Sequence, residues 1–218
     1  MMMVRRRWLM VSVVKSKSPP PPDAQPAWDI ARLFPYQGHW DEADYLSLDT
    51  NQLVEFTDGF IEVLAMPDMR HQLCVGYLFD ALKAFISPEK LGRVLFAPFS
   101  IRLRPNKFRQ PDVMLMLAAH ADRMGNSYWD GADLVIEVVS PDRASQERDR
   151  EKKRADYAEA GIPVYWIIDP QISRVIVLKL EGSGYTIYGE FGRGQHASSP
   201  FLQGFSIDVD ALFAAANG

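Results

Sequence analysis

Two acidic residues lie in apolar segments, where a carboxylate is costly. Asp112 is near the start of Pro111–Leu117, and Glu137 is near the end of Leu134–Val139. Apolar, β-branched runs bounded by turn residues are typical of strands covered on both faces. A buried ionised carboxylate is unfavourable by several kcal/mol unless it finds a cation, a metal or a proton. Antiparallel pairing of the two segments would bring both acids together, and their repulsion favours a divalent cation between them.

The segment after the second acid is highly charged and predicts a helix from Glu147 to Glu159. Asp149, Lys153 and Tyr157 recur every four residues, so they share one helix face, and Gly161 at the next step ends the helix. On charge pattern alone, a solvated face is the commoner explanation. It would contain i,i+4 pairs such as Asp149 with Lys153 and Lys152 with Asp156.

The run Val164–Pro170 predicts the next strand. A strand–helix–strand order favours a parallel crossover within one sheet. The acids and the charged helix are therefore expected to meet on the same sheet.

In this order, the features resemble the putative restriction endonuclease domain family, a bacterial branch of the PD-(D/E)XK nuclease superfamily. The resemblance covers residues 45 to 213. It implies an α/β fold with a mixed central β-sheet flanked by helices, an N-terminal β-hairpin and a C-terminal β extension. The matching motifs are Pro111-Asp112, Glu137–Pro141, the series Asp149, Lys153, Tyr157 and Gly161, and Tyr165–Pro170, with weaker matches at Glu55, Asp58-Gly59 and Arg70-His71.

The resemblance implies a Mg²⁺-dependent (or Mn²⁺-dependent) endonuclease that hydrolyses phosphodiester bonds in DNA, with RNA as an alternative substrate. Asp112, Glu137 and the carbonyl of Val138 would hold the ion, since Mg²⁺ prefers hard oxygen ligands. Lys153 would orient the attacking water or stabilise the transition state, and Glu55 would help to hold a second ion or a water.

One position departs from the superfamily pattern. The pattern places a lysine two residues after the acid, but Val139 stands there. The resemblance implies that the missing lysine comes from the following helix as Lys153, with Lys152 as the alternative. If neither lysine reaches the acids, the fold would remain without the chemistry.

Further residues are second-tier candidates for binding nucleic acid. A solvated loop is the commoner explanation for a run of four cations before Asp112, but beside the acids this loop would contact phosphates. His71 lies in the first turn of a predicted helix, Met69–Ile86, that Asp68 caps. For a lone histidine there, a hydrogen-bonded structural role is commoner than ligand binding. The second-tier residues are Arg102, Arg104, Lys107, Arg109, His71, Lys152 and Tyr157.

The Asp58-Gly59 turn predicts a hairpin of Leu53–Thr57 with Phe60–Leu64. A two-residue turn sets Glu55 opposite Glu62, and like charges opposite each other are destabilising. Either a metal or a basic group compensates, or both acids are solvated.

The remaining segments predict shorter elements. They are a helix at Trp28–Phe34, a short polar segment at Asp41–Leu46, a strand from Arg93 through Ser100 to Leu103, a polar loop up to Asp130, a hairpin of Val175–Leu178 with Tyr185–Tyr188, a strand at Phe205–Val209 and a helix at Asp210–Ala216.

Length and composition limit the possible number of domains and the possible classes of protein. The 218 residues are enough for one domain, which we expect over 28–218 after a disordered leader, 1–27. The net charge of −4 argues against a broadly basic surface. A single cysteine, Cys74, favours a core position and a reducing cytoplasm. No segment is long and apolar enough for a membrane span.

Three alternatives to an active nuclease stay open. The first is a catalytically degenerate nuclease fold that binds nucleic acid or a partner. The second is a structural dimerisation module whose charged helix keeps it soluble. A small-molecule hydrolase is less favoured, because no nucleophile elbow or Ser/Cys–His set is visible. For an active nuclease we expect a homodimer, because cutting two strands requires two sites.

Overall fold

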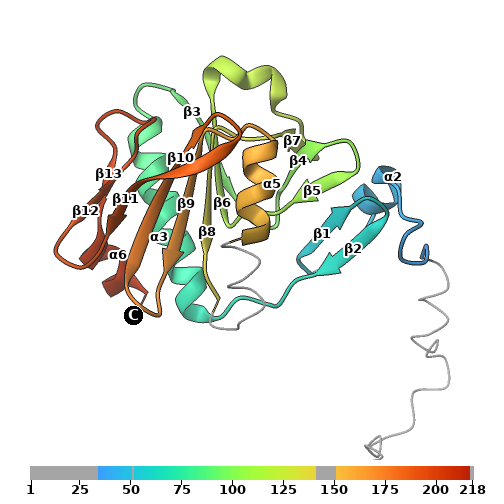
Figure 1. Ribbon diagram of the computed structural model, residues 1–218, viewed down its shortest axis with the longest axis horizontal. Coiled ribbons are helices and arrows are strands. Elements are labelled where there is room, and N and C mark those ends of the chain that lie inside the picture. Colours follow the sequence, from blue (N-terminus) through green and yellow to red (C-terminus); the bar gives the residue numbers. More distant parts are fainter. Residues whose placement is uncertain (1–33, 51, 141–150, 217–218) are drawn as a thin grey trace, which may run out of the picture. The chain divides into compact units, whose positions relative to one another are not determined.

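The centre of the fold is a six-stranded mixed sheet of order β11-β10-β9-β8-β6-β3 (Figure 1). The structure is a computed structural model that describes residues 34–50, 52–140 and 151–216, and Tyr36–Gly218 forms one compact unit. The strands are β3 (Gly92–Phe96), β6 (Val113–Leu117), β8 (Leu134–Val138), β9 (Val164–Asp169), β10 (Arg174–Glu181) and β11 (Gly184–Phe191).

A second sheet of five strands has the order β2-β1-β5-β4-β7. A third, two-stranded sheet pairs β12 with β13. The strands of these sheets are β1 (Val54–Thr57), β2 (Phe60–Val63), β4 (Ser100–Arg104), β5 (Lys107–Arg109), β7 (Tyr128–Asp130), β12 (His196–Ser198) and β13 (Ser206–Asp208).

Helices cover both faces of the central sheet, with α3 behind it and α5 in front in Figure 1. Successive side chains of a strand point to opposite faces, so Val113 and Ile136 pack with α3 and α6, whereas Met114 and Val135 pack with α5. The helices are α2 (Glu42–Leu46), α3 (Met69–Ile86), η1 (Ala118–Arg123, a 3₁₀ helix), α5 (Lys153–Glu159) and α6 (Val209–Ala215). None of the helices in the described part of the chain is long and apolar enough to cross a membrane.

Several sequence predictions are confirmed. The mixed α/β, restriction endonuclease-like fold is present, with β6 antiparallel and β9 parallel to β8. α3 begins after Asp68, whose side chain accepts a hydrogen bond from the His71 N–H. The hairpin register sets Glu55 opposite Glu62. Gly161, with a φ of 72°, follows α5.

Other predictions are wrong. The strand predicted from Arg93 to Leu103 is two strands in different sheets, β3 and β4. Pro98 lies between them, and proline has no N–H for a ladder. The predicted polar loop before Asp130 contains η1 and β7, and β12 was not predicted. The leader 1–27 and the helix at Trp28–Phe34, except Phe34, lie outside the described residues, as do Glu147–Arg150 of the charged helix.

Candidate active site

The ends of β6 and β8 bring Asp112 and Glu137 together. The two strands are antiparallel with Val113 opposite Ile136, and Asp112 and Glu137 are the residues directly next to this last pair. Asp112 Oδ2 accepts a hydrogen bond from the backbone N–H of Val138 at 2.7 Å and lies 3.1 Å from Nε2 of His71. The capped first turn of α3 therefore holds His71 against Asp112.

Glu137 is buried on the face of the sheet that α5 covers, with 2% of its surface exposed. Lys153 Nζ donates to Glu137 Oε2 at 2.8 Å, and the Tyr157 hydroxyl donates to Oε1 at 2.6 Å. One turn of helix separates these two donors, as their shared face predicts. Both carboxylate oxygens are thus held by the same helix face.

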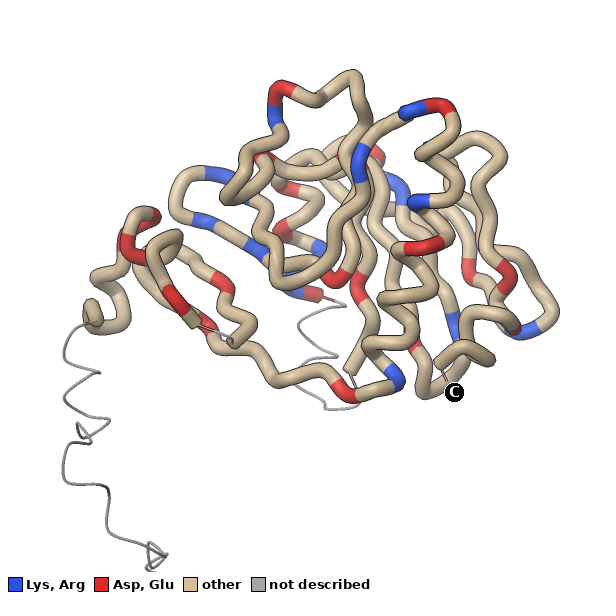
Figure 2. Tube along the Cα trace, turned by 180° about the vertical axis from the view of Figure 1, so that it is seen from behind, with Lys and Arg blue, Asp and Glu red and all other residues tan. Residues whose placement is uncertain are grey.

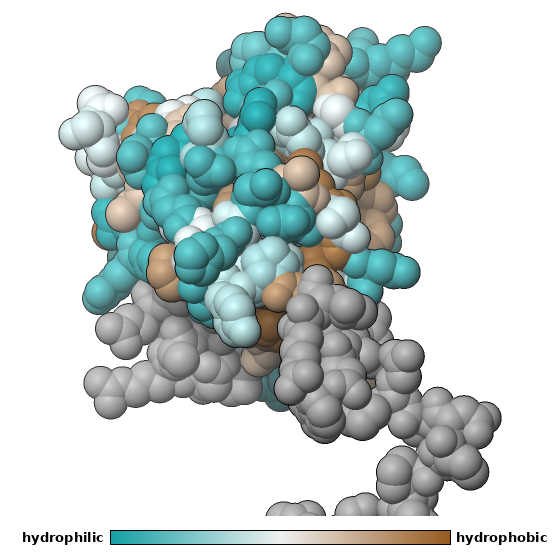
Figure 3. Space-filling view, turned by 90° about the vertical axis from the view of Figure 1, so that its right-hand side faces the viewer, coloured by the Kyte–Doolittle hydropathy of each residue, from teal (hydrophilic) through white to brown (hydrophobic). Residues whose placement is uncertain are grey.

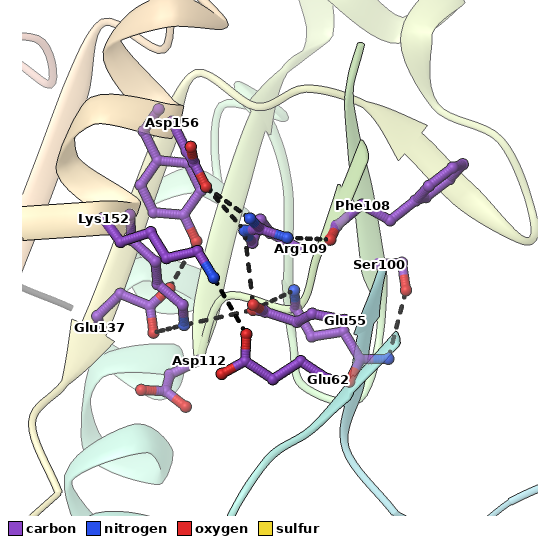
Figure 4. Close-up of polar contacts among 12 residues, drawn as sticks. Glu55, Glu62, Ser100, Phe108, Arg109, Asp112, Glu137, Lys152 and Asp156 are labelled. Carbon is purple, nitrogen blue, oxygen red and sulfur yellow. Dashed lines mark hydrogen bonds and ion pairs between the residues drawn. The ribbon is translucent and has the colours of Figure 1, made fainter. Parts of the chain in front are cut away.

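Glu55 comes from β1 of the five-stranded sheet and points toward Arg109 (Figure 4); it also reaches Lys153. Its Oε1 lies 3.5 Å from Lys153 Nζ and accepts a hydrogen bond from the Gln110 N–H at 3.2 Å. Its Oε2 lies 3.5 Å from Nε of Arg109. With 1% exposure, Glu55 is not a solvated residue of an exposed face.

The two neighbouring lysines make different contacts. Lys153 is buried and touches Glu137 and Glu55. The Lys152 side chain is 54% exposed and pairs with Glu62 at 3.2 Å. Each acid of the hairpin therefore faces one lysine of the charged segment, and these basic groups compensate the like charges. Asp149 lies outside the described residues.

The four cations before Asp112 are not in a loop, because they lie on β4 and β5. Arg102 pairs with Asp130 at 2.7 Å, and Arg104 pairs with Asp58 at the same distance. Lys107 and Arg109 are 7% and 2% exposed, respectively. Figure 2 shows basic and acidic positions interspersed along the trace.

Asp156 is the residue that sequence reasoning missed. It is 8% exposed and accepts from both Lys107 Nζ and the Arg109 guanidinium, so it does not form the predicted solvated pair with Lys152. Its position three residues after Lys153 and beside Tyr157 was an available signal, because i and i+3 share a helix face.

Burial and charge act together on two further groups. Burial, reinforced by the neighbouring Glu137 carboxylate, raises the pKa of Tyr157 well above its ordinary value. Burial by itself would lower the pKa of Arg109, but Glu55 and Asp156 outweigh it and raise the pKa. Tyr157 is therefore a neutral donor and Arg109 a cation at neutral pH.

A small cavity of about 30 Å³ opens beside the acids and is lined by His71, Asp112, Glu137, Val138 and Lys153, among others. That volume is close to that of one water molecule. Within residues 34–50, 52–140 and 151–216, no group of three His, Cys, Asp or Glu residues is arranged to hold a metal. Two carboxylates and one backbone carbonyl still suit Mg²⁺, which keeps several waters.

Asp112 supports this fit. Hydrogen bonds reach its Oδ2, whereas Oδ1 accepts none from the described residues. Within the same part of the chain, Asp112 has an ion pair with His71 but none with lysine or arginine. Around the cavity and the neighbouring strand β5, the acids Glu55, Asp112, Glu137 and Asp156 are buried together with the cations Lys107, Arg109 and Lys153.

A mixed sheet that presents two acids at neighbouring strand ends, with a lysine beside them, defines a restriction endonuclease-like protein. The chain belongs to the Uma2 family, described as a putative restriction endonuclease, whose model matches residues 41–210. The family indicates nuclease chemistry on nucleic acid. A solved structure, a putative nuclease belonging to DUF820 from Anabaena variabilis ATCC 29413, is similar with a TM-score of 0.65 and 18% identity over 80% of this chain and 97% of that one. No curated protein matches the chain.

Proposed function

We propose that this protein is a metal-dependent endonuclease that hydrolyses phosphodiester bonds in DNA. One observation carries the proposal. The buried ammonium of Lys153 lies 2.8 Å from Glu137 and 3.5 Å from Glu55, and Glu137 shares a cavity with Asp112. An acid, an acid and a lysine are the parts that superfamily members use, and the family match supports nuclease chemistry.

Asp112, Glu137 and the carbonyl of Val138 would hold Mg²⁺ or Mn²⁺. When bound, such an ion activates a water and neutralises charge on the phosphate. Asp112 Oδ1 is open to a ligand, as described above. A bound cation would also pair with Asp112, which has no lysine or arginine partner among the described residues, and buried charges need pairing.

The other side chains hold these groups in place. His71 and the Val138 N–H fix Asp112, and Tyr157 fixes Glu137. The Lys153 ammonium lies beside Glu137 and Glu55, where it would orient a water or stabilise negative charge on the transferred phosphate. Glu55 restrains the Lys153 ammonium from the opposite side and offers a further oxygen for a water or a second ion.

The surface suits a polar substrate. The face shown in Figure 3, turned 90° from the view of Figure 1, is mainly hydrophilic with small apolar areas. The half-buried cations Arg102 and Arg104 would reach phosphates only by leaving Asp130 and Asp58. Cutting both strands of a duplex requires two sites, so we propose a homodimer.

A second candidate function is a catalytically degenerate fold that binds nucleic acid. The observation that favours it is Val139, which is 1% exposed and fills the position of the superfamily lysine with an apolar side chain. In that case Lys153 would serve only to neutralise buried acids.

Cleavage assays separate these candidates. Plasmid and single-stranded DNA are incubated with Mg²⁺ or Mn²⁺ and the wild type, Asp112→Ala, Lys153→Ala or Lys152→Ala. Metal-dependent nicking that Asp112→Ala and Lys153→Ala abolish and Lys152→Ala retains is expected. Loss with Lys152→Ala alone would assign the role to the other lysine. No cleavage, together with no Mn²⁺ binding in calorimetry, would favour the degenerate fold.

A further inference from the structure

A chain of alternating charges connects the five-stranded sheet with the candidate active site. Each contact is an ion pair, and each partner is largely buried. In spatial order the chain runs through Lys107, Asp156, Arg109, Glu55, Lys153 and Glu137. Asp156 and Lys153 belong to α5, so the helix enters this chain twice.

Arg109 is the centre of the chain, and its donors are already used. Nε and Nη2 donate to Asp156 Oδ2 at 3.0 and 2.7 Å. Nη1 donates to Thr57 Oγ1 at 2.8 Å. In this two-pronged contact both nitrogens converge on one oxygen, and Lys107 Nζ holds the other oxygen of Asp156, so the carboxylate is fixed in orientation as well as distance. Arg109 thereby fixes α5 relative to β1, the strand that carries Glu55.

The position of Asp156 on the helix makes this contact relevant to the site. Lys153 and Tyr157 are the two donors to Glu137. Asp156 follows Lys153 by three residues and directly precedes Tyr157. Because α5 is short, anchoring Asp156 sets both the rotation and the height of these donors over β8. A shift of about 1 Å in such a group reduces turnover by about 100-fold.

We infer that Asp156, held by Lys107 and Arg109, is a positioning residue that places Lys153 and Tyr157 against Glu137. The inference rests on the proposed function. It also changes the expectation that all four cations before Asp112 contact phosphates. Lys107 and Arg109 act through Asp156 and do not contact phosphates. Of the four cations, Arg102 and Arg104 remain for that role.

The first test is Asp156→Asn, which keeps the shape of the side chain and removes its charge. The matched control is Asp58→Asn, because Asp58 also accepts a two-pronged contact, from Arg104, at 2.8 and 2.7 Å, but its side chain is 54% exposed and it touches β4. We expect Asp156→Asn to lower kcat by about 100-fold with KM unchanged, and Asp58→Asn to leave kcat unchanged. If folded Asp156→Asn lowers kcat by less than threefold, the inference is overturned.

A spectroscopic readout does not require activity. In protein labelled with ¹⁵N-lysine, the Lys153 Nζ resonance is assigned by its loss in Lys153→Met. Asp156→Asn is expected to shift this resonance and Asp58→Asn to leave it in place; an unshifted resonance in Asp156→Asn would refute positioning. If the wild type cleaves nothing, the proposed function fails, yet this spectrum still decides the role of Asp156.

Two further variants cover misfolding and phosphate contact. Arg109→Lys keeps the charge but not the two-pronged geometry, and it is expected to shift the same resonance even if Asp156→Asn does not fold. Lys107→Gln is tested by the salt dependence of DNA binding without divalent metal. If Lys107 only positions Asp156, the slope of log K for DNA binding against log salt stays unchanged. A lost phosphate contact would make this negative slope shallower by about 0.9 and would overturn the inference.

Discussion

Replacing each of two adjacent lysines by methionine should have very different effects on stability. The Lys153 side chain is 3% exposed and lies 2.8 Å from Glu137 and 3.5 Å from Glu55. At an effective dielectric constant of about 20, these attractions are about 6 and about 5 kcal/mol, and desolvation offsets more than half of the sum. Lys153→Met leaves two buried acids with less compensation, so we expect a loss of about 3–5 kcal/mol in the free energy of unfolding.

Lys152→Met is the matched control, since its partner Glu62 and its own side chain are exposed. A surface pair contributes about 0–1 kcal/mol. The assay is equilibrium unfolding in urea at neutral pH, because urea does not screen charges. Equal losses for the two variants, or a loss under 1 kcal/mol for Lys153→Met, would refute the assignment of Lys153 as the buried partner of both acids.

A double-mutant cycle then isolates the pair. Glu137→Gln removes the charge that Lys153 contacts most closely. Combined with Lys153→Met, it should destabilise less than the two single changes add up to, with a coupling of about 0.5–3 kcal/mol, because the two groups are in direct contact. Simple additivity would mean that Glu55 alone holds the lysine.

Two further substitutions and one labelling experiment test other parts of the structure. Tyr157→Phe should weaken the fall in the free energy of unfolding above pH 10. Burial and Glu137 raise the pKa of Tyr157 in the folded state, so the wild type loses about 1.4 kcal/mol per pH unit once the tyrosine of the unfolded chain ionises. Unfolding curves between pH 8 and 11 compare the two proteins. The Cys74 thiol, buried and with its pKa raised to about 11, should react with a thiol reagent only on unfolding, and fast labelling of the native protein would contradict its burial. Gly92→Ala should lower the melting temperature by several degrees, because the added Cβ would lie 2.2 Å from the Met116 carbonyl oxygen; an unchanged melting curve would contradict the β3–β6 packing.

Local sequence was sufficient for the parts of the site that depend on one strand or one helix. The acids at Asp112 and Glu137 stand out because a carboxylate in an apolar run needs a partner. The spacing of Lys153 and Tyr157 predicts a shared helix face, and both reach the same carboxylate. The Asp58-Gly59 turn fixes the hairpin register.

Contacts between distant segments were not predictable in this way. Lys107, Arg109 and Asp156 all look solvated in sequence, since charged residues are rarely buried unless they pair with each other. The pairing depends on how β5 packs against α5, which no local pattern contains. Pro98 was also overlooked: it ends β3, so the chain continues into another sheet as β4.

The alternating charges have a consequence for the order in which the chain folds. Within this chain of charges, Lys107 and Asp156 are 49 residues apart in sequence, and Arg109 and Asp156 are 47 apart. The neighbouring exposed pair, Lys152 and Glu62, is 90 residues apart. Loops of this length close late, after local contacts have formed. Glu55, Asp112 and Glu137 all precede α5 in sequence, so they are synthesised before Lys153. A nascent chain therefore carries these carboxylates before it carries Lys153, and the proposed site is complete only once α5 has been synthesised.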